Sequence, residues 1–322
     1  LRQAFSFHTL LLGGNPFTTS AIYALIHALE RRGGVWFALG GTGALVAGLT
    51  RLFEDLGGTV RLSAPVAQIT TQGDRATGVE LASGETLPAD LVVSNADIVH
   101  TYKNLLSGND RGQSEAKRLT NRRFSNSLFV IYFGLDREVP NDLEHHVILF
   151  GPRYRELLAD IFEGPSLPDD FSLYLHAPSK TDPSLAPEGQ SAYYVLAPVP
   201  HLGAAAIDWA VEGPKYRDRI LAYLEQHAIP RLRDTLVTSR IFTPADFSTV
   251  LNAHMGSAFS LEPILLQSAY FRGHNRDDRI SNLYLVGAGT HPGAGIPGVV
   301  GSAKATASLV LEDFAPPALA AE

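Results

Sequence analysis

The stretch VGAGTHPGAGIPGVVGSA, residues 286–303, decides the fold that we expect. The mostly apolar segment 282–286 is typical of a buried parallel strand, and the small and apolar residues 298–312 predict a helix. The glycines between them allow a close approach of the backbone, and the helix N-terminus offers N–H groups to negative charge. The stretch therefore predicts a turn that faces an anion, although close packing alone would also explain its glycines.

Three of these glycines, Gly293, Gly295 and Gly298, match the pattern G-x-G-x-x-G. The match begins several residues after the strand and contains Pro297, whereas a dinucleotide fingerprint opens directly from its strand. We therefore do not interpret it as a dinucleotide-binding fingerprint.

The composition narrows the class of protein. The chain has 322 residues, of which 45% are hydrophobic and 18% charged, and this balance is that of a globular protein. The net charge of -7 and the scattered basic residues argue against nucleic acid as a partner. No cysteine is present, which excludes disulfides and thiolate metal sites. Charge-free stretches such as 3–29 are broken by Gly, Pro and Asn, so we expect no membrane-spanning helix but leave surface attachment open.

The order of patterns along the chain predicts two discontinuous domains. A helix with Thr42 as N-cap, a small β-meander and a buried strand at 91–93 precede aromatic-rich strands such as 127–133. We expect strand 283–286 to lie parallel to 91–93 or its neighbours in one domain, and a mainly antiparallel sheet in the other. The predicted boundaries are 36–100 and 272–314 for the first domain, 1–35 and 101–271 for the second, and 315–322 for a frayed tail.

Several stretches together resemble the flavin-dependent amine oxidase and carotenoid desaturase superfamily: Gly40-Gly41-Thr42, the meander, Ser94-Asn95-Ala96-Asp97 and 286–293. More narrowly, nearly the whole chain is similar to the C-terminal two thirds of bacterial-type phytoene desaturases, which are FAD-dependent members of the carotenoid/retinoid oxidoreductase family. The matching segments are 2–7, 125–133, 150–156, 170–178, 197–203 and 282–306. Since the chain starts at Leu1, we expect that start to be internal to a longer protein.

The resemblance implies an α/β fold: a partial, Rossmann-like FAD-binding domain of glutathione-reductase type with an inserted substrate domain. The first βαβ unit of that domain would lie before Leu1, so we expect an incomplete FAD site and an inactive isolated chain. A second departure is Ala38-Leu39, where the family usually has Pro-Arg near the flavin.

The implied function is FAD-dependent desaturation of a C40 carotene precursor, phytoene toward lycopene, by hydride transfer to flavin. The alternatives are a carotenoid ketolase or isomerase of the same superfamily, and a non-catalytic module that binds apolar lipids.

The same resemblance assigns candidate site residues. The helix N-terminus near Gly298 and Val299 would stabilise the anionic reduced flavin, and Val66 would hold the adenine through its backbone or, alternatively, be a core strand residue. The full cofactor-binding set is Val66, Gly287, Gly289, Thr290, Gly295, Ile296, Gly298 and Val299.

Two residues are candidate acid–base groups, each with a structural alternative. His291 has an unperturbed pKa near neutrality but could simply hold the turn, and Asp246 follows Pro244 and Ala245 where a helix N-cap or turn residue is common. We expect no metal site, because the adjacent pair His145-His146 alone does not make one.

The expected partners are phytoene or a related carotene and a membrane surface. A C40 hydrocarbon must be collected from lipid, and the apolar segment 4–29, with its break at 13–16, suits a bent element that opens a tunnel to the membrane. The alternative is that this segment only covers the substrate-domain sheet. The expected localisation is cytoplasmic, peripheral to the inner membrane.

Overall fold

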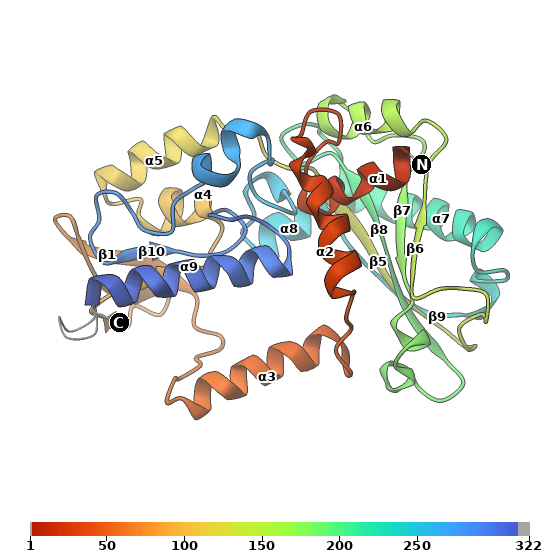
Figure 1. Cartoon of the computed structure of the whole chain (residues 1–322), viewed down its shortest axis with the longest axis horizontal. Helices are drawn as coiled ribbons and strands as arrows, with labels where there is room; N and C mark the ends of the chain where they lie inside the picture. The colour runs from red at the N-terminus through yellow and green to blue at the C-terminus, as the bar shows by residue number, and fades with distance from the viewer. Residues whose placement is uncertain (1, 315–322) are drawn as a thin grey trace. The chain divides into compact units, whose positions relative to one another are not determined.

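The computed structural model describes residues 2–314, and the tail 315–322 that we expect to be frayed lies outside the described residues. The described chain groups into two compact units (Figure 1). The first unit contains 25–61 and 127–246, and the second contains 2–24, 62–126 and the chain from Phe247 on.

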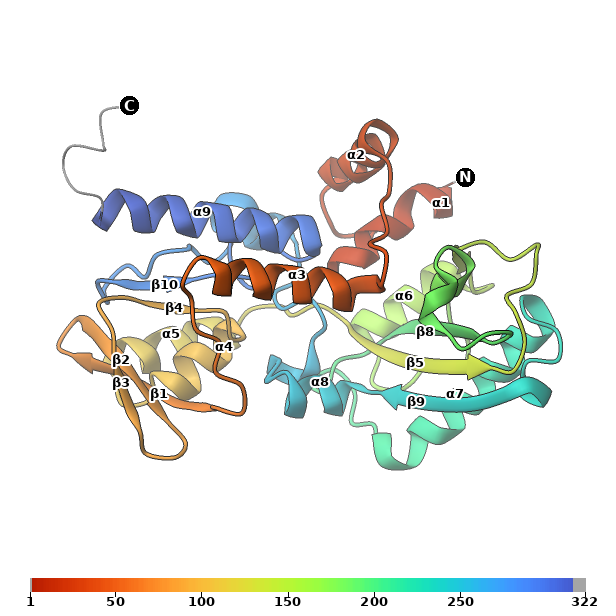
Figure 2. The same cartoon turned by 90° about the horizontal axis from the view of Figure 1, so that it is seen from below.

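The first unit is built on a five-stranded antiparallel sheet with strand order β6-β7-β8-β5-β9. Figure 2 shows β5, β8 and β9 side by side. The strands are β5 Ser127–Leu135, β6 His146–Leu149, β7 Leu173–His176, β8 Ser191–Val199 and β9 Leu236–Phe242. The aromatic-rich strands that we predicted to form a mainly antiparallel sheet therefore do so.

One face of this sheet carries the core of the unit. In β8, alternate residues from Ser191 to Val199 are buried, as expected for a strand with one face against a core. Helix α7, Trp209–His227, packs against that face and buries Tyr216, Ile220 and Leu224. The other helices of the unit are α2 Leu25–Gly33, α3 Gly41–Asp55 and α6 Tyr154–Glu163, with 3-10 turns at Pro178–Lys180, Pro183–Leu185 and Arg233–Thr235.

The start of α3 differs from the prediction. The N-cap is Gly40 and not Thr42, which lies inside the first turn. Gly40 adopts φ 79°, a left-handed conformation that glycine reaches without steric cost, and its N–H donates to Asp182 Oδ2 at 2.6 Å. The carboxylate that accepts this bond lies 142 residues away in the sequence, so no local pattern reveals it.

The second unit combines a parallel strand pair with a small antiparallel meander. Strands β4, Val92–Ser94, and β10, Leu283–Leu285, pair in parallel with Leu283 opposite Val92, which confirms the predicted pairing. The meander is β1 Val66–Gln72, β2 Arg75–Leu81 and β3 Thr86–Pro88.

Helix α9 of this unit, Ile296–Phe314, lies along β10 (Figure 1). The remaining helices are α1 Arg2–Ser6, α4 Ile98–His100, a π-helical turn Thr101–Leu105 and α5 Asp110–Thr120, with 3-10 turns at Phe7–Leu12, Ala21–Ala24, His254–Gly256, Leu265–Gln267 and Ala269–Phe271. Helix α8, Pro244–Val250, contains the boundary between the units. Among residues 2–314, no helix is both long and apolar enough to cross a membrane.

The boundaries of the two units differ from those of the predicted domains. Residues 101–126 belong to the second unit because Tyr102, Leu105, Leu119 and Phe124 share a core with Leu283 and Leu285. Residues 36–61, which we predicted with the flavin domain, group with the first unit, where Asp182 binds the start of α3.

The packing of α7 on the sheet makes a stability prediction. Phe129 is fully buried, stacks on Trp209 at 5.6 Å between ring centroids and meets the edge of Tyr216 at 5.0 Å. We expect Phe129→Ala to lower the free energy of unfolding by about 3–5 kcal/mol, because it removes apolar contacts and leaves a cavity. The control Val237→Ala, at a position exposed on β9, is expected to cost less than ~0.5 kcal/mol. Urea unfolding followed by Trp fluorescence measures both, and equal losses would contradict this description of the core.

Candidate functional site

The candidate site lies at the carboxyl ends of β4 and β10. The Val286 N–H donates to the Ser94 carbonyl at 3.0 Å, and Asn95 Nδ2 donates to the Val286 carbonyl at 3.0 Å. In open parallel sheets, ligands bind just outside the carboxyl ends of the strands. The pairing therefore brings the segment 94–97 and the glycine-rich turn to one edge, at the place where a ligand is expected.

The glycines of the turn are required by close packing. A Cβ on Gly287 would lie 2.6 Å from Asn95 Nδ2, and one on Gly289 would lie 2.9 Å from Ile98 Cβ. Gly287, Gly293 and Gly295 also adopt positive φ angles of 113°, 142° and 88°. Gly287 and Gly289 thus pack against residues 95–98, in agreement with the close packing that we gave as the other explanation of these glycines. Their contact with a cofactor stays a prediction.

The end of the turn folds back on itself at the start of α9. A Cβ on Gly298 would lie only 2.5 Å from the Gly293 carbonyl oxygen. The Val299 N–H donates to the Gly295 carbonyl at 2.9 Å, and the first N–H groups of a helix have no acceptor within the helix. The helix begins at Ile296, two residues before the predicted start, and Ile296 is 60% exposed. Positive helix-dipole potential is therefore presented at an accessible N-terminus.

Thr290 belongs to a buried polar network. Its hydroxyl donates to the Gly287 carbonyl at 3.0 Å and lies 2.9 Å from Ser302 Oγ. Asn275 Nδ2 lies within hydrogen-bond distance of Ser302 Oγ, Thr306 Oγ1 and the Leu285 carbonyl, at 2.9, 3.1 and 3.2 Å. The network ties strand β10, the turn and α9 together, so Thr290 positions the turn.

A buried guanidinium lies directly behind the turn. Arg272 is 3% exposed, and its Nε donates to the Ala288 carbonyl at 3.0 Å. Among the described residues, its hydrogen bonds go to backbone carbonyls and none goes to a carboxylate. Burial lowers the pKa of Arg272 to about 10, so the side chain stays cationic at neutral pH. Arg272 and Asn275 were not found from the sequence, because no motif marks them.

Val66 and His291, two further candidates from the sequence, lie outside the buried polar network of Thr290. Val66 begins β1 opposite Leu81 and is 37% exposed, so it is not the core residue of the alternative interpretation. His291 is exposed, and its Nδ1 lies 3.2 Å from the Ala269 carbonyl, a contact that fits an imidazole holding the turn.

Asp246 belongs to the first unit, and its Oδ2 accepts hydrogen bonds from the Thr243 N–H and hydroxyl, both at 2.7 Å. Asp246 is thus the third residue of α8 and pairs with Thr243, which precedes the helix, as in a capping box, so these contacts are structural but Asp246 is not the N-cap that we named as its alternative. The catalytic roles of Asp246 and His291 stay predictions.

The outer face of the antiparallel sheet holds a second candidate site. A mainly apolar cavity of about 570 Å³ lies over β5, β8 and β9. Tyr194 and Arg240 stand directly opposite Tyr132 on its two neighbouring strands, and all three line the cavity. The other lining residues include Pro178, Leu185, Ala186, Pro187, Ala192 and Val237. A volume of this size is typical of a small-molecule site.

Comparison with known proteins places these features in a family. A family model described as flavin containing amine oxidoreductase matches residues 1–311. The lycopene-forming phytoene desaturase of Paracoccus sp. is 68% identical over 315 residues, which are 98% of this chain and 63% of that protein. The lycopene-forming enzyme of Pantoea ananas is 64% identical over 314 residues, which are 98% of this chain and 64% of that protein. The neurosporene-forming enzyme of Rhodobacter capsulatus is 44% identical, over 96% of this chain and 60% of that protein.

These relatives confirm the resemblance to bacterial phytoene desaturases, and the chain spans about 63% of the length of the Paracoccus protein. Among solved structures, an oxidoreductase from Methanosarcina mazei has a TM-score of 0.63 at 16% identity, over 96% of this chain and 63% of the other. A putrescine oxidase variant has a TM-score of 0.57 at 13% identity, over 97% and 64%. Such identities establish the fold alone, a mixed α/β fold. Since the family model accounts for 311 of the 322 residues, the chain belongs to the flavin-containing amine oxidoreductases.

Proposed function

We propose that this chain carries the flavin-facing turn and the substrate unit of an FAD-dependent phytoene desaturase that acts toward lycopene. The observation that carries the proposal is the 68% identity to the lycopene-forming enzyme of Paracoccus sp. over 98% of the chain. The first βαβ unit of the cofactor domain is not among the residues of this chain. The finer architecture is then a partial Rossmann-like domain of glutathione-reductase type with an inserted substrate domain.

The residues of the second unit fit a flavin. The N-terminus of α9 and the buried Arg272 together place positive potential at the glycine-rich turn, where an anionic reduced ring would be stabilised. FAD, when bound, supplies the hydride acceptor for desaturation. Thr290 and Asn275 keep the turn in one geometry, so these dipoles do not have to reorganise when charge develops. The adenine half of the cofactor has no complete site in this chain, because the only G-x-G-x-x-G match in it is the rejected one at 293–298.

The substrate unit offers the second half of the proposal. The cavity over β5, β8 and β9 is lined mostly by apolar and aromatic side chains, which suits a hydrocarbon. Tyr132 and Tyr194 face each other across the strands at 6.0 Å between ring centroids and provide flat apolar surfaces. We propose that part of a carotene chain lies against this face.

We further propose that the protein works at the inner membrane, attached from the cytoplasmic side. The N-terminal segment of the second unit supports this, because its side chains Phe5, Leu11 and Phe17 are 62%, 38% and 46% exposed. Leu12, in the same segment, lies against the flavin-facing turn: a Cβ on Gly295 would be 3.3 Å from Leu12 Cδ2. The segment therefore joins a candidate membrane contact to the candidate cofactor turn within one unit.

The function is tested by comparing two purified proteins, the 322-residue chain and the full-length enzyme. The chain alone is expected to show no flavin absorption, because the nucleotide half of the site is incomplete. The full-length protein is expected to show flavin bands and to convert phytoene in liposomes to a more conjugated polyene. Flavin retained by the chain alone would contradict the incomplete site, and a flavin-loaded full-length protein without desaturated product would contradict the reaction.

A pair of matched glycine substitutions tests the turn. Gly298 and Gly43 each occupy the third position of a helix, but a Cβ on Gly43 meets no atom within 4 Å. Gly298→Ala is expected to lower the free energy of unfolding by about 1–3 kcal/mol, because the new methyl group forces the turn away from the Gly293 carbonyl. Gly43→Ala is expected to be neutral or to stabilise by up to ~1 kcal/mol.

Urea unfolding of the 322-residue chain measures both effects, and the flavin content of the full-length variants measures the consequence for the cofactor. We expect flavin loss only in Gly298→Ala. Normal stability and normal flavin content in this variant would exclude the tight turn as a cofactor element.

The membrane proposal is tested by liposome flotation of the full-length protein. Replacing Phe5, Leu11 and Phe17 by Ser removes exposed apolar area and is expected to reduce flotation and the turnover of liposomal phytoene. The matched control replaces the exposed Val211, Leu251 and Leu311 by Ser and is expected to leave both unchanged. Unchanged flotation of the first variant, with its fold intact, would place the membrane contact elsewhere.

A further inference from the structure

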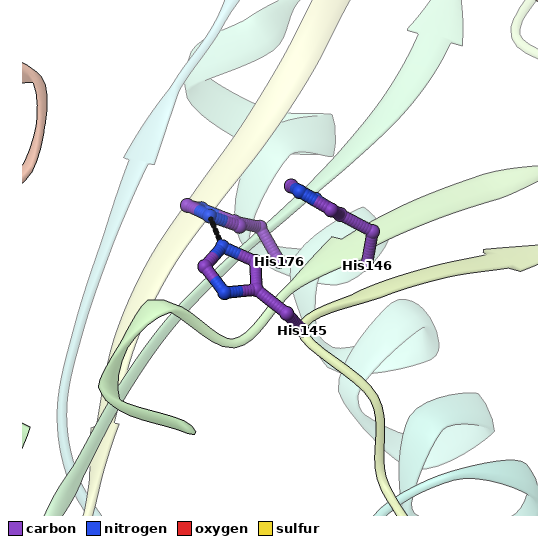
Figure 3. A group of neighbouring side chains, drawn as sticks. All are labelled: His145, His146 and His176. Carbon is purple, nitrogen blue, oxygen red and sulfur yellow. Dashed lines mark hydrogen bonds between the residues drawn. The ribbon is translucent and has the colours of Figure 1, made fainter. Parts of the chain in front are cut away.

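Three histidines of the first unit converge at the edge of the antiparallel sheet. His146 lies at the start of β6, His176 at the end of β7, and His145 directly precedes β6 (Figure 3). One ring nitrogen from each lies within 4.8 Å of those of the other two. The sequence shows only the adjacent pair, since His176 comes 31 residues after His145.

The backbone holds these side chains in place. His146 and His176 are directly opposite each other in the antiparallel β6–β7 pair, so their side chains leave the sheet on the same face. The Ala177 N–H donates to the His145 carbonyl at 2.9 Å and fixes the residue before β6 against the end of β7. The cluster is therefore built on paired strands and not on a free loop.

Hydroxyl groups orient two of the three rings. His145 Nδ1 lies 2.5 Å from Thr181 Oγ1, and His146 Nδ1 lies 2.7 Å from Tyr174 Oη. Both hydroxyls can accept a hydrogen bond, which favours the tautomers with the proton on Nδ1 and a lone pair on Nε2. Metal-binding histidines show this arrangement, in which the second ring nitrogen donates to a neighbouring polar group.

Burial and apolar surface surround the three imidazoles. Burial lowers the pKa of His145 and of His146, and burial together with the two neighbouring rings lowers the pKa of His176 to about 4. The negative charge of Glu30 opposes burial at His146, because it raises the pKa of that imidazole. Phe37 meets the rings of His145 and His176 at 4.8 and 5.8 Å between centroids, so apolar surface covers one side.

We propose that His145, His146 and His176 bind a divalent transition-metal ion of the zinc class through their Nε2 atoms, with water in an open fourth position. Three imidazoles suit Zn²⁺, Co²⁺, Ni²⁺ or Cu²⁺, whereas Mg²⁺ and Ca²⁺ require oxygen ligands. His146 is exposed and His176 is buried, so one side of the cluster is open to an incoming ion and a water molecule.

Binding requires one small rearrangement. His145 Nε2 and His176 Nε2 lie 2.7 Å apart, as in a hydrogen bond, whereas two nitrogens on one tetrahedral zinc lie about 3.3 Å apart. The rings therefore separate slightly, and the ion takes the place of the shared N–H. The proton of His176 Nε2 moves to His176 Nδ1, a buried atom with no hydrogen-bond partner among the described residues.

The experiment is a metal titration of the chelator-treated 322-residue chain. Co²⁺ is the probe, because imidazole ligation gives it visible d–d absorption, and Zn²⁺ is then added to displace it. We expect saturable Co²⁺ bands that Zn²⁺ removes, and no competition from Mg²⁺. His146→Gln and His176→Gln are each expected to lose one equivalent of bound Co²⁺ or to weaken its binding by at least ~10-fold.

His227→Gln is the matched control, since His227 lies at the end of α7 in the same unit and outside the cluster. It is expected to bind Co²⁺ as the unchanged chain does. Circular dichroism of the metal-free proteins checks folding, and the exposed His146 provides the decisive variant where His176→Gln unfolds the unit. A chain without Co²⁺ bands, or variants that bind as the unchanged chain does, would overturn the proposal and leave the three residues as a hydrogen-bonded cluster. Loss in His227→Gln as well would identify non-specific binding and overturn it equally.

Discussion

The parallel pairing of β4 with β10 is the constraint on which the second unit depends. It joins segments far apart in the chain, since Asn95 donates to a carbonyl 191 residues later. Asn282, just before β10, extends the junction to the meander: its Nδ2 donates to the Ala76 carbonyl and its Oδ1 accepts from the Ala76 N–H. Without this pairing Gly287 and Gly289 would lose a surface that they pack on, because they lie directly against residues 95–98.

Buried polar groups convert this junction into a site of fixed geometry. The Thr290 and Ser302 hydroxyls bond to each other, and Asn275 Nδ2 lies within hydrogen-bond distance of the Ser302 and Thr306 hydroxyls. The turn and the start of α9 therefore cannot move separately without breaking several hydrogen bonds. The cationic Arg272 is held by carbonyl groups on the other side of the turn. The first unit uses a different device, in which strand register places Tyr194, Tyr132 and Arg240 in one row on a sheet face.

The sequence predicted what depends on local patterns. The apolar strands at 91–93 and 283–286, the glycine-rich turn and the antiparallel sheet each have a signature within a few residues, and the structure contains them. It could not predict Asn275, Arg272 or His176, because each acquires its role only when distant strands or loops meet. The predicted N-cap of α3, Thr42, is wrong: the helix begins after Gly40, whose N–H donates to the distant Asp182. The boundaries of the two units also depend on core contacts, such as those of Phe124, that leave no mark in composition.

The burial of Arg272 has a consequence for the response to ionic strength. Mobile ions screen exposed charges over a distance of about 8 Å at physiological salt, but they cannot enter the packed space behind the turn. Its guanidinium is covered by the carbonyl-bearing segments around Phe259, Leu261 and Ala288. The share of the positive potential that Arg272 supplies is thus screened less by salt than the share from the accessible N-terminus of α9, so in concentrated salt a negative charge that develops at the turn is stabilised mainly by the buried guanidinium.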